Sequence, residues 1–310
     1  MVWVGTATVG GIGSDPMLSG MGMDPASAPE MFDAAVRAGC RVLDTADSYA
    51  GGTSERTVGR WLGGRRDVLV ATKTGVRPPY PTRDLSPAHV RRSVRSSLDR
   101  LGLDRIDLLM SHRPDPVTPP TTVVRTFGEL VAEGLVGHVG ACNVTADEVR
   151  ELLAAADVEG VPRIEWVQNR LNVVVHRGEQ EVLDVCRAHD VGYIAHSVLA
   201  GGVLAGRGRR EPRPGSRLAV KPEVYDRYRS PEVSAAVRAF EVDAARLGVP
   251  VQVLAQAWVL GVPGVSGLVA GPQQREHVPA SVDACALRLD PDEHARIGRH
   301  FAALHGSGSE

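Results

Sequence analysis

Eight short apolar runs recur along the chain, with helix-like segments between them. The runs are rich in Val, Ile and Leu and mostly do not alternate with polar residues, which is typical of parallel strands buried on both faces. They cover 2–6, 41–44, 68–73, 106–112, 138–143, 166–169, 193–199 and 265–270. Between them, Ser86-Pro87 starts an amphipathic stretch that Gly102 ends, and Thr145 with Glu148 has the spacing of a capping box. Strand and helix therefore alternate along the whole chain, which predicts an α/β domain.

The number of strands favours a (β/α)8 TIM barrel formed by residues 1–305 as a single domain. A doubly wound parallel sheet is the alternative, but it usually carries a glycine-rich phosphate loop after its first strand. Here Gly11-Ile12-Gly13 lacks the third glycine of that loop, and the sequence has no P-loop motif. We expect the Arg-, Gly- and Pro-rich segment 206–230 to form a long loop lid, and the C-terminal helices to lie over the barrel mouth. Residues 306–310 are expected to be a flexible tail.

The composition is that of an ordinary globular protein, with 43% hydrophobic and 23% charged residues among 310. A formal net charge of -2 gives no support for a nucleic-acid partner or an anionic membrane surface. Four cysteines without a C-x-x-C spacing suit a reducing, cytoplasmic setting. The N-terminus lacks the basic region of a signal peptide. Glutamines and a Gly-Val-Pro-Gly turn interrupt the uncharged stretch 251–271, so we expect a helix and a strand there, not a membrane span.

Polar side chains end most of the predicted strands. In a barrel the C-terminal ends of the strands meet at one mouth, where catalytic groups lie. The residues at the ends of the first seven strands include Thr6, Asp44, Lys73, His112, Asn143, Gln168 and His196. An aspartate, a lysine and a histidine within one such set predict a functional site. No second His or Cys stands at a metal-ligand spacing, so we expect no metal ion.

Lys73 is the most informative of these residues, because the 35 basic residues include only two lysines, Lys73 and Lys221. An ammonium at the end of a buried strand needs a counter-charge, and Asp44 ends the preceding strand. The pair could simply hold two strands together. Tyr49 in the loop after Asp44 indicates chemistry instead, because a neighbouring ammonium lowers the pKa of a phenol and suits it to general acid catalysis. A deprotonated Lys73 would suit another class of enzyme, a Schiff-base aldolase.

A set of short motifs follows in order along nearly the whole chain. They are Asp44-Thr45-Ala46-Asp47-Ser48-Tyr49, Gly51-Gly52-Thr53-Ser54-Glu55, Thr72-Lys73, His112-Arg113, Gly140-Ala141-Cys142-Asn143, Gln168-Asn169, Ser197-Val198-Leu199-Ala200-Gly201-Gly202 and Val269-Ala270-Gly271-Pro272. This set resembles the aldo-keto reductases. The resemblance implies a barrel that binds NADPH, or less often NADH, across its mouth, with Asp44, Tyr49, Lys73 and His112 as the catalytic residues. The tyrosine would protonate a carbonyl oxygen while the nicotinamide delivers hydride. The lysine and aspartate would tune the phenol, and the histidine would orient the carbonyl.

The same resemblance implies a larger set of residues around the cofactor and the substrate. Asn143 and Gln168 would bind the nicotinamide carboxamide, and Ser197, Leu199 and Gly201 would line the pyrophosphate path. The other expected cofactor contacts are Gly5, Thr6, Asp44, Cys142, His196, Gly271, Gln273, Arg275, His277 and Ser281. The expected substrate contacts are Trp3, Tyr49, His112, Arg113 and Tyr225.

Three positions depart from the pattern of this family. Cys142 stands where serine is usual, and it offers a weaker hydrogen-bond donor. His196 replaces the tyrosine or tryptophan whose ring stacks on the nicotinamide, and an imidazole stacks with less area. Gln273 replaces the arginine that commonly meets the 2′-phosphate, so we expect Arg275 to take this role from the first turn of a helix starting near Pro272.

The sequence thus predicts a cytoplasmic, NAD(P)H-dependent reductase of a small-molecule aldehyde or ketone, for which a sugar-like or secondary-metabolite carbonyl is one candidate. The alternative within the same fold is a non-catalytic, cofactor-sensing regulatory subunit. The presence of all four catalytic residue types favours catalysis. The sequence does not indicate an oligomeric state.

Overall fold

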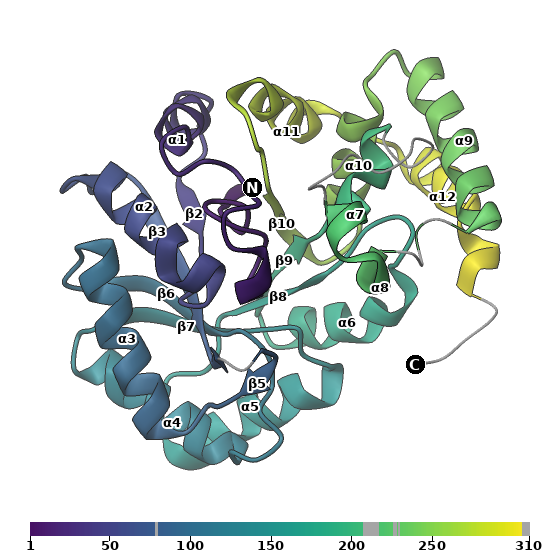
Figure 1. Ribbon diagram of the computed structural model, residues 1–310. Helices are drawn as coiled ribbons and strands as arrows, with labels where there is room; N and C mark the ends of the chain where they lie inside the picture. Colours follow the sequence, from purple (N-terminus) through teal and green to yellow (C-terminus); the bar gives the residue numbers. More distant parts are fainter. Residues whose placement is uncertain (78–79, 207–216, 226–227, 229, 306–310) are drawn as a thin grey trace.

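Eight parallel strands close into a barrel in the computed structural model (Figure 1). The structure describes residues 1–310 except 78–79, 207–216, 226–227, 229 and 306–310. The barrel strands are β1 (Val2–Gly5), β2 (Val42–Asp44), β3 (Leu69–Thr74), β6 (Ile106–Ser111), β7 (Val136–Cys142), β8 (Trp166–Arg170), β9 (Gly192–His196) and β10 (Val265–Ala270). Their order around the barrel is β1-β10-β9-β8-β7-β6-β3-β2. The (β/α)8 barrel is confirmed and the doubly wound sheet is wrong, because β1 pairs with both β2 and β10.

Helices follow the strands and pack around the outside of the barrel (Figure 1). They are α1 (Ala28–Arg37), α2 (Thr53–Leu62), α3 (Pro87–Leu101), α4 (Pro120–Ala132), α5 (Ala146–Glu159), α6 (Gln180–Ala188), α10 (Val251–Leu260) and α11 (Val278–Ala286). The capping box at Thr145 forms as predicted, with its hydroxyl accepting from the Glu148 amide. Gly102 ends α3 in the left-handed region, at φ 64°.

The C-terminal helices lie on the side of the barrel, which differs from the expectation that they cover its mouth. Helix α11 packs between α10 and α1 as the last barrel helix. Helix α12 (Pro291–Arg299) packs on the outer side of α10 and on α9 (Pro231–Arg246). There the His294 ring stacks on Trp258 at 4.7 Å, and Arg296 bonds Asp243. Each helix buries its apolar side against neighbouring helices, so neither is drawn toward the polar mouth.

The segment expected to be a long loop contains two short helices, α7 (Arg217–Val220) and α8 (Pro222–Tyr225). Its stretches 207–216, 226–227 and 229, like the predicted tail 306–310, lie outside the described residues. A hairpin of β4 (Val76–Arg77) and β5 (Thr82–Arg83) follows β3. Short 3-10 turns complete the described chain: η1 (Pro16–Leu18), η2 (Tyr49–Gly52), η3 (Arg177–Glu179), η4 (Ala200–Ala205), η6 (Arg275–His277) and η7 (Ala302–His305).

The barrel interior is apolar at the end where the strands begin. The Trp3 ring lies 5.6 Å from Trp166, among Ala71, Leu108 and Ile194. The polar groups at the strand ends gather at the opposite end of the barrel, where the strands finish.

The uncharged stretch 251–271 forms α10 and β10, as predicted. No helix in the described part of the chain is long and apolar enough to cross a membrane.

Candidate active site

Lys73 and Asp44 form a buried ion pair between neighbouring strands β3 and β2. The ammonium is 1% exposed and lies 2.6 Å from Asp44 Oδ1, and it also donates to the Thr45 carbonyl at 3.0 Å. The Gln168 amide donates to the same Asp44 oxygen at 2.7 Å. Burial lowers the pKa of Lys73, but Asp44 and Tyr49 raise it more, so the pKa lies above its usual value. The ammonium stays charged at neutral pH, which argues against a Schiff-base aldolase.

Tyr49 lies beside this ammonium, at the start of η2 in the loop after β2. Its ring centroid is 5.2 Å from Lys73 Nζ and 5.5 Å from the His112 ring, with an interplanar angle of 82° between the rings. The backbone turns sharply after it, because Ala50, Gly51 and Gly52 all have positive φ. The Tyr49 ring is thereby held against both of the residues that were expected to act with it.

The expectation that Lys73 lowers the pKa of Tyr49 below its usual value is wrong. Burial raises the pKa to about 12, and the Lys73 charge offsets only part of this effect. Removing the phenol from water disfavours the phenolate more than one cation can compensate, since Asp44 opposes that cation. The phenol is therefore protonated throughout the neutral range, which is the state that a proton donor requires.

His112 follows β6 and is held neutral. Its pKa is lowered well below the usual value by burial, then by the charges of Lys73 and Arg113. Nδ1 lies 3.4 Å from the Ser48 hydroxyl, which in turn contacts Ser14 at 2.8 Å. Nε2 makes no hydrogen bond with the described residues, so it is free to meet a carbonyl oxygen.

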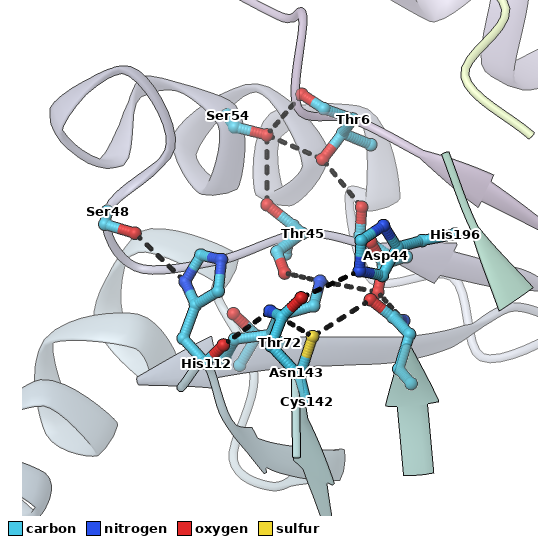
Figure 2. A network of polar contacts seen from close by, with 12 residues as sticks. Thr6, Asp44, Thr45, Ser48, Ser54, Thr72, His112, Cys142, Asn143 and His196 are labelled. Atoms are coloured by element: carbon cyan, nitrogen blue, oxygen red, sulfur yellow. Dashed lines mark hydrogen bonds and ion pairs between the residues drawn. The ribbon is translucent and has the colours of Figure 1, made fainter. Parts of the chain in front are cut away.

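A second layer of buried polar groups supports the ion pair (Figure 2). Thr6 is fully buried, and its backbone amide and its hydroxyl both donate to the Asp44 carbonyl, at 2.9 and 3.0 Å. Its hydroxyl also contacts Ser54 at 2.7 Å. Gly5 has no room for a side chain, since a Cβ would lie 2.7 Å from Val269. Both residues are expected cofactor contacts, and in the structure Thr6 also holds the Asp44 backbone in place.

Glu55 and Asp47 are buried carboxylates next to the motif residues of the site, and no role was predicted for them. Glu55 on α2 is fully buried, accepts from Thr72 at 2.6 Å and pairs with Arg100 at 2.7 Å. Asp47 accepts a short hydrogen bond from Ser93, and burial raises its pKa to about 7. Both residues stand in the motifs quoted above, but their burial depends on α3, a distant part of the sequence.

The expected nicotinamide contacts lie together at the ends of β7, β8 and β9 (Figure 2). Asn143 is in the left-handed region at φ 58°, where asparagine is tolerated, and donates to the His112 carbonyl at 2.9 Å. Its amide oxygen lies 3.0 Å from His196 Nε2, and His196 Nδ1 lies 3.0 Å from the Ser197 hydroxyl. The Cys142 thiol contacts the Gln168 amide oxygen at 3.7 Å. The His196 imidazole, which is expected to stack on the nicotinamide, is therefore also held by contacts of both its ring nitrogens.

The turn after β9 brings backbone to the barrel mouth. Ser197, Ala200, Gly201 and Gly202 all have positive φ, and Leu199 precedes η4. Successive backbone N–H groups in turns with left-handed residues can form the concave surfaces that bind phosphates. A Cβ on Gly201 would lie 2.5 Å from the Tyr225 ring. Tyr225, an expected substrate contact, therefore packs on the expected pyrophosphate turn.

The expected adenosine contacts follow β10. Arg275 is the first residue of η6, the 3-10 turn that leads directly into α11, so it lies in the opening turn of this helical segment as expected. Its side chain is 63% exposed, bonds Glu276 at 2.8 Å and lies 3.9 Å from Glu30. The backbone N–H of Gln273 donates to His277 Nδ1 at 3.3 Å. Ser281 in α11 is buried, and a Cβ on Gly271 would meet nothing within 4 Å.

Trp3 does not belong to this site. It is 2% exposed, and its indole nitrogen donates to the sulfur of Met1 at 2.9 Å, at the end of the barrel where the strands begin. Because it lies in the middle of β1 and points inward, it fills the barrel core. Among the described residues, no group of three His, Cys, Asp or Glu side chains could hold a metal ion.

The sequence and the fold both match known proteins. The Aldo/keto reductase family model matches residues 2–301. The chain is 30% identical over 285 residues to the NADH-specific methylglyoxal reductase of Escherichia coli (strain K12), covering 86% of this chain and 84% of that protein. It is 31% identical over 257 residues to a probable voltage-gated potassium channel subunit beta of Arabidopsis thaliana, covering 79% and 78%. The structure of the glycerol dehydrogenase AKR11B4 from Gluconobacter oxydans is similar, with a TM-score of 0.83 at 25% identity, and covers 100% of this chain and 93% of that one. The chain therefore belongs to the aldo/keto reductase family.

Proposed function

We propose that this protein is an NAD(P)H-dependent reductase of a small-molecule aldehyde or ketone. The observation that carries the proposal is the position of Tyr49, whose ring lies 5.2 Å from a buried ammonium and 5.5 Å from a neutral histidine. A protonated phenol, a cation and a neutral imidazole beside one another at a barrel mouth fit the protonation of a carbonyl oxygen.

The residues at the mouth fit a nicotinamide dinucleotide. Asn143 and Gln168 place amide groups at the ends of β7 and β8, which suits the carboxamide of nicotinamide. The left-handed turn from Ser197 to Gly202 suits a pyrophosphate. When bound, the nicotinamide supplies the hydride that reduces the carbonyl carbon.

In the proposed mechanism the protein supplies the proton and its placement. His112 donates from Nε2 to the carbonyl oxygen and orients the substrate. Tyr49 transfers its hydroxyl proton to that oxygen, and the Lys73 ammonium stabilises the phenolate that remains. Asp44 holds the ammonium in place through a contact of 2.6 Å.

The choice of cofactor is proposed as NADPH, with NADH possible. Arg275 supplies a guanidinium near the expected 2′-phosphate, but this guanidinium already forms an ion pair with the Glu276 carboxylate, at 2.8 Å. Exposed ion pairs of this kind are weak, so a phosphate could displace the carboxylate. One similar protein is named as NADH-specific, so this preference is tested separately below.

A regulatory subunit remains the second candidate, because a channel subunit of a plant is among the similar proteins. The four catalytic residues are all present here, and their contacts favour turnover.

A panel of aldehydes and ketones, supplied with NADPH or NADH and followed by nicotinamide absorbance, tests the proposed function. We expect cofactor oxidation that depends on the carbonyl and is lost in the Asp44→Asn/Lys73→Met double variant. Cofactor binding without oxidation by any carbonyl would contradict the reductase and support the regulatory subunit.

A further inference from the structure

Arg113 is a partly buried cation at the barrel mouth, directly after His112. It makes no hydrogen bond or ion pair with the residues that the structure describes. The nearest carboxylate along the chain, Asp115, is already engaged by the Leu85 amide at 2.9 Å and the Thr118 hydroxyl at 2.7 Å. By contrast, Arg91, Arg125 and Arg163 each pair with a surface carboxylate. Arg113 is therefore a charge that no carboxylate of the described residues balances.

The charge of Arg113 reaches the groups at the centre of the site. After burial and Lys73, it is the next cause that lowers the pKa of His112. It also opposes the effect of burial on the pKa of the Cys142 thiol. Since Asp44 balances Lys73, Arg113 is the remaining arginine or lysine whose charge acts on His112.

The position of Arg113 separates it from the expected phosphate path of the cofactor. Arg113 follows β6, whereas the pyrophosphate turn follows β9 and the adenosine contacts follow β10. Strands β7 and β8 lie between β6 and β9 around the barrel. Arg113 therefore borders the side of the mouth that is left to the substrate.

We propose that Arg113 binds a carboxylate of the substrate, so that the protein reduces aldehydes or ketones that carry an acidic group. This inference rests on the proposed function and specifies its substrate class. A guanidinium presents two parallel N–H donors that match the two oxygens of a carboxylate. A partly buried guanidinium without a partner keeps a desolvation cost, which a bound carboxylate offsets. One unbalanced positive charge matches one carboxylate, whereas a phosphate monoester would need more.

The test compares 4-carboxybenzaldehyde with its neutral methyl ester, methyl 4-formylbenzoate, as substrates. The two aldehydes share the reacting group and the ring, so their ratio of kcat/KM isolates the charge. We expect this ratio to fall about ten- to hundredfold in Arg113→Gln, because a charge-assisted hydrogen bond is lost. Arg113→Lys should restore part of the ratio. Arg105→Gln, which removes an exposed arginine just before the start of β6, should leave the ratio unchanged.

Binding of terephthalate, an unreactive dicarboxylate, gives a readout that does not need turnover. Calorimetry should show weaker binding to Arg113→Gln than to the parent protein, each loaded with cofactor. A ratio of kcat/KM that is the same in the parent and Arg113→Gln, or equal terephthalate binding, would overturn the inference while leaving the reductase intact. If neither aldehyde is reduced, the wider panel of carbonyls still tests the proposed function, and the terephthalate titration by itself decides the role of Arg113.

Discussion

Replacing Lys73 with methionine distinguishes an ammonium that acts on Tyr49 from one that only holds β2 and β3 together. The side chain keeps most of its volume but loses its charge. Its Nζ lies 5.2 Å from the centroid of the Tyr49 ring. Taking this distance as the separation of the two charges, and an effective dielectric constant of about 20, the ammonium stabilises the phenolate by about 3 kcal/mol. The pKa of Tyr49 should therefore rise further, by about 2 units.

This loss sets the expected effect on the reaction. Because the phenolate forms as the proton is transferred, kcat for reduction should fall about ten- to hundredfold. In the alcohol-oxidation direction, where the phenolate is the base, the pH profile should move to higher pH. Steady-state kinetics over a range of pH measure both effects.

The fold should also lose stability, because Asp44 keeps a buried charge without its cation. Breaking such a pair costs about 3–5 kcal/mol of unfolding free energy. In the Asp44→Asn/Lys73→Met double variant both charges are gone, so most of this loss should be recovered, but turnover should not. Recovery of turnover together with stability would refute the electrostatic role and leave a purely structural ion pair.

Three further changes test separate parts of the structure. Asp47→Asn should stabilise the fold more near pH 8 than near pH 5. Burial raises the pKa of Asp47 to about 7, whereas the carboxyl of the unfolded chain ionises near its usual, lower pKa. Denaturant titrations at both pH values measure the gain in unfolding free energy, and equal gains would contradict this prediction. Arg275→Ala should weaken the binding of NADPH about tenfold and leave the binding of NADH nearly unaffected, whereas Glu276→Gln should strengthen the binding of NADPH. Fluorescence titrations measure these affinities, and equal losses for both cofactors in Arg275→Ala would mean that Arg275 faces solvent. Glu55→Gln should lower the unfolding free energy by about 3 kcal/mol, because it leaves Arg100 without its buried, charged partner. A thermal midpoint equal to that of the parent protein would contradict this prediction.

The barrel and its ion pair could be predicted because both depend on local patterns. Apolar runs without alternation indicated buried parallel strands, and the polar residues that ended most of these runs marked the mouth. Lys73 and Asp44 end adjacent strands, so the barrel brings them within 2.6 Å of each other. The Thr145 capping box was predictable for the same reason, since its two partners are three residues apart.

The errors concern quantities that depend on residues far apart in the chain. The sequence indicated a cation near Tyr49, but the extent of burial decides the pKa, and burial depends on the whole mouth. The family resemblance implied Trp3 as a substrate contact, but its place within β1 puts it in the core. Arg275 faces Glu30, which lies on α1 at the other end of the sequence.

The most direct test of the central claim is the turnover of Tyr49→Phe. Phenylalanine preserves the ring that lies against Lys73 and His112, and it removes the hydroxyl that is proposed to donate the proton. With a carbonyl that the parent protein reduces, kcat should fall about 10²–10⁴-fold, while the cofactor still binds with a dissociation constant within about threefold of the parent. A kcat close to that of the parent protein would contradict the assignment of Tyr49 as the proton donor.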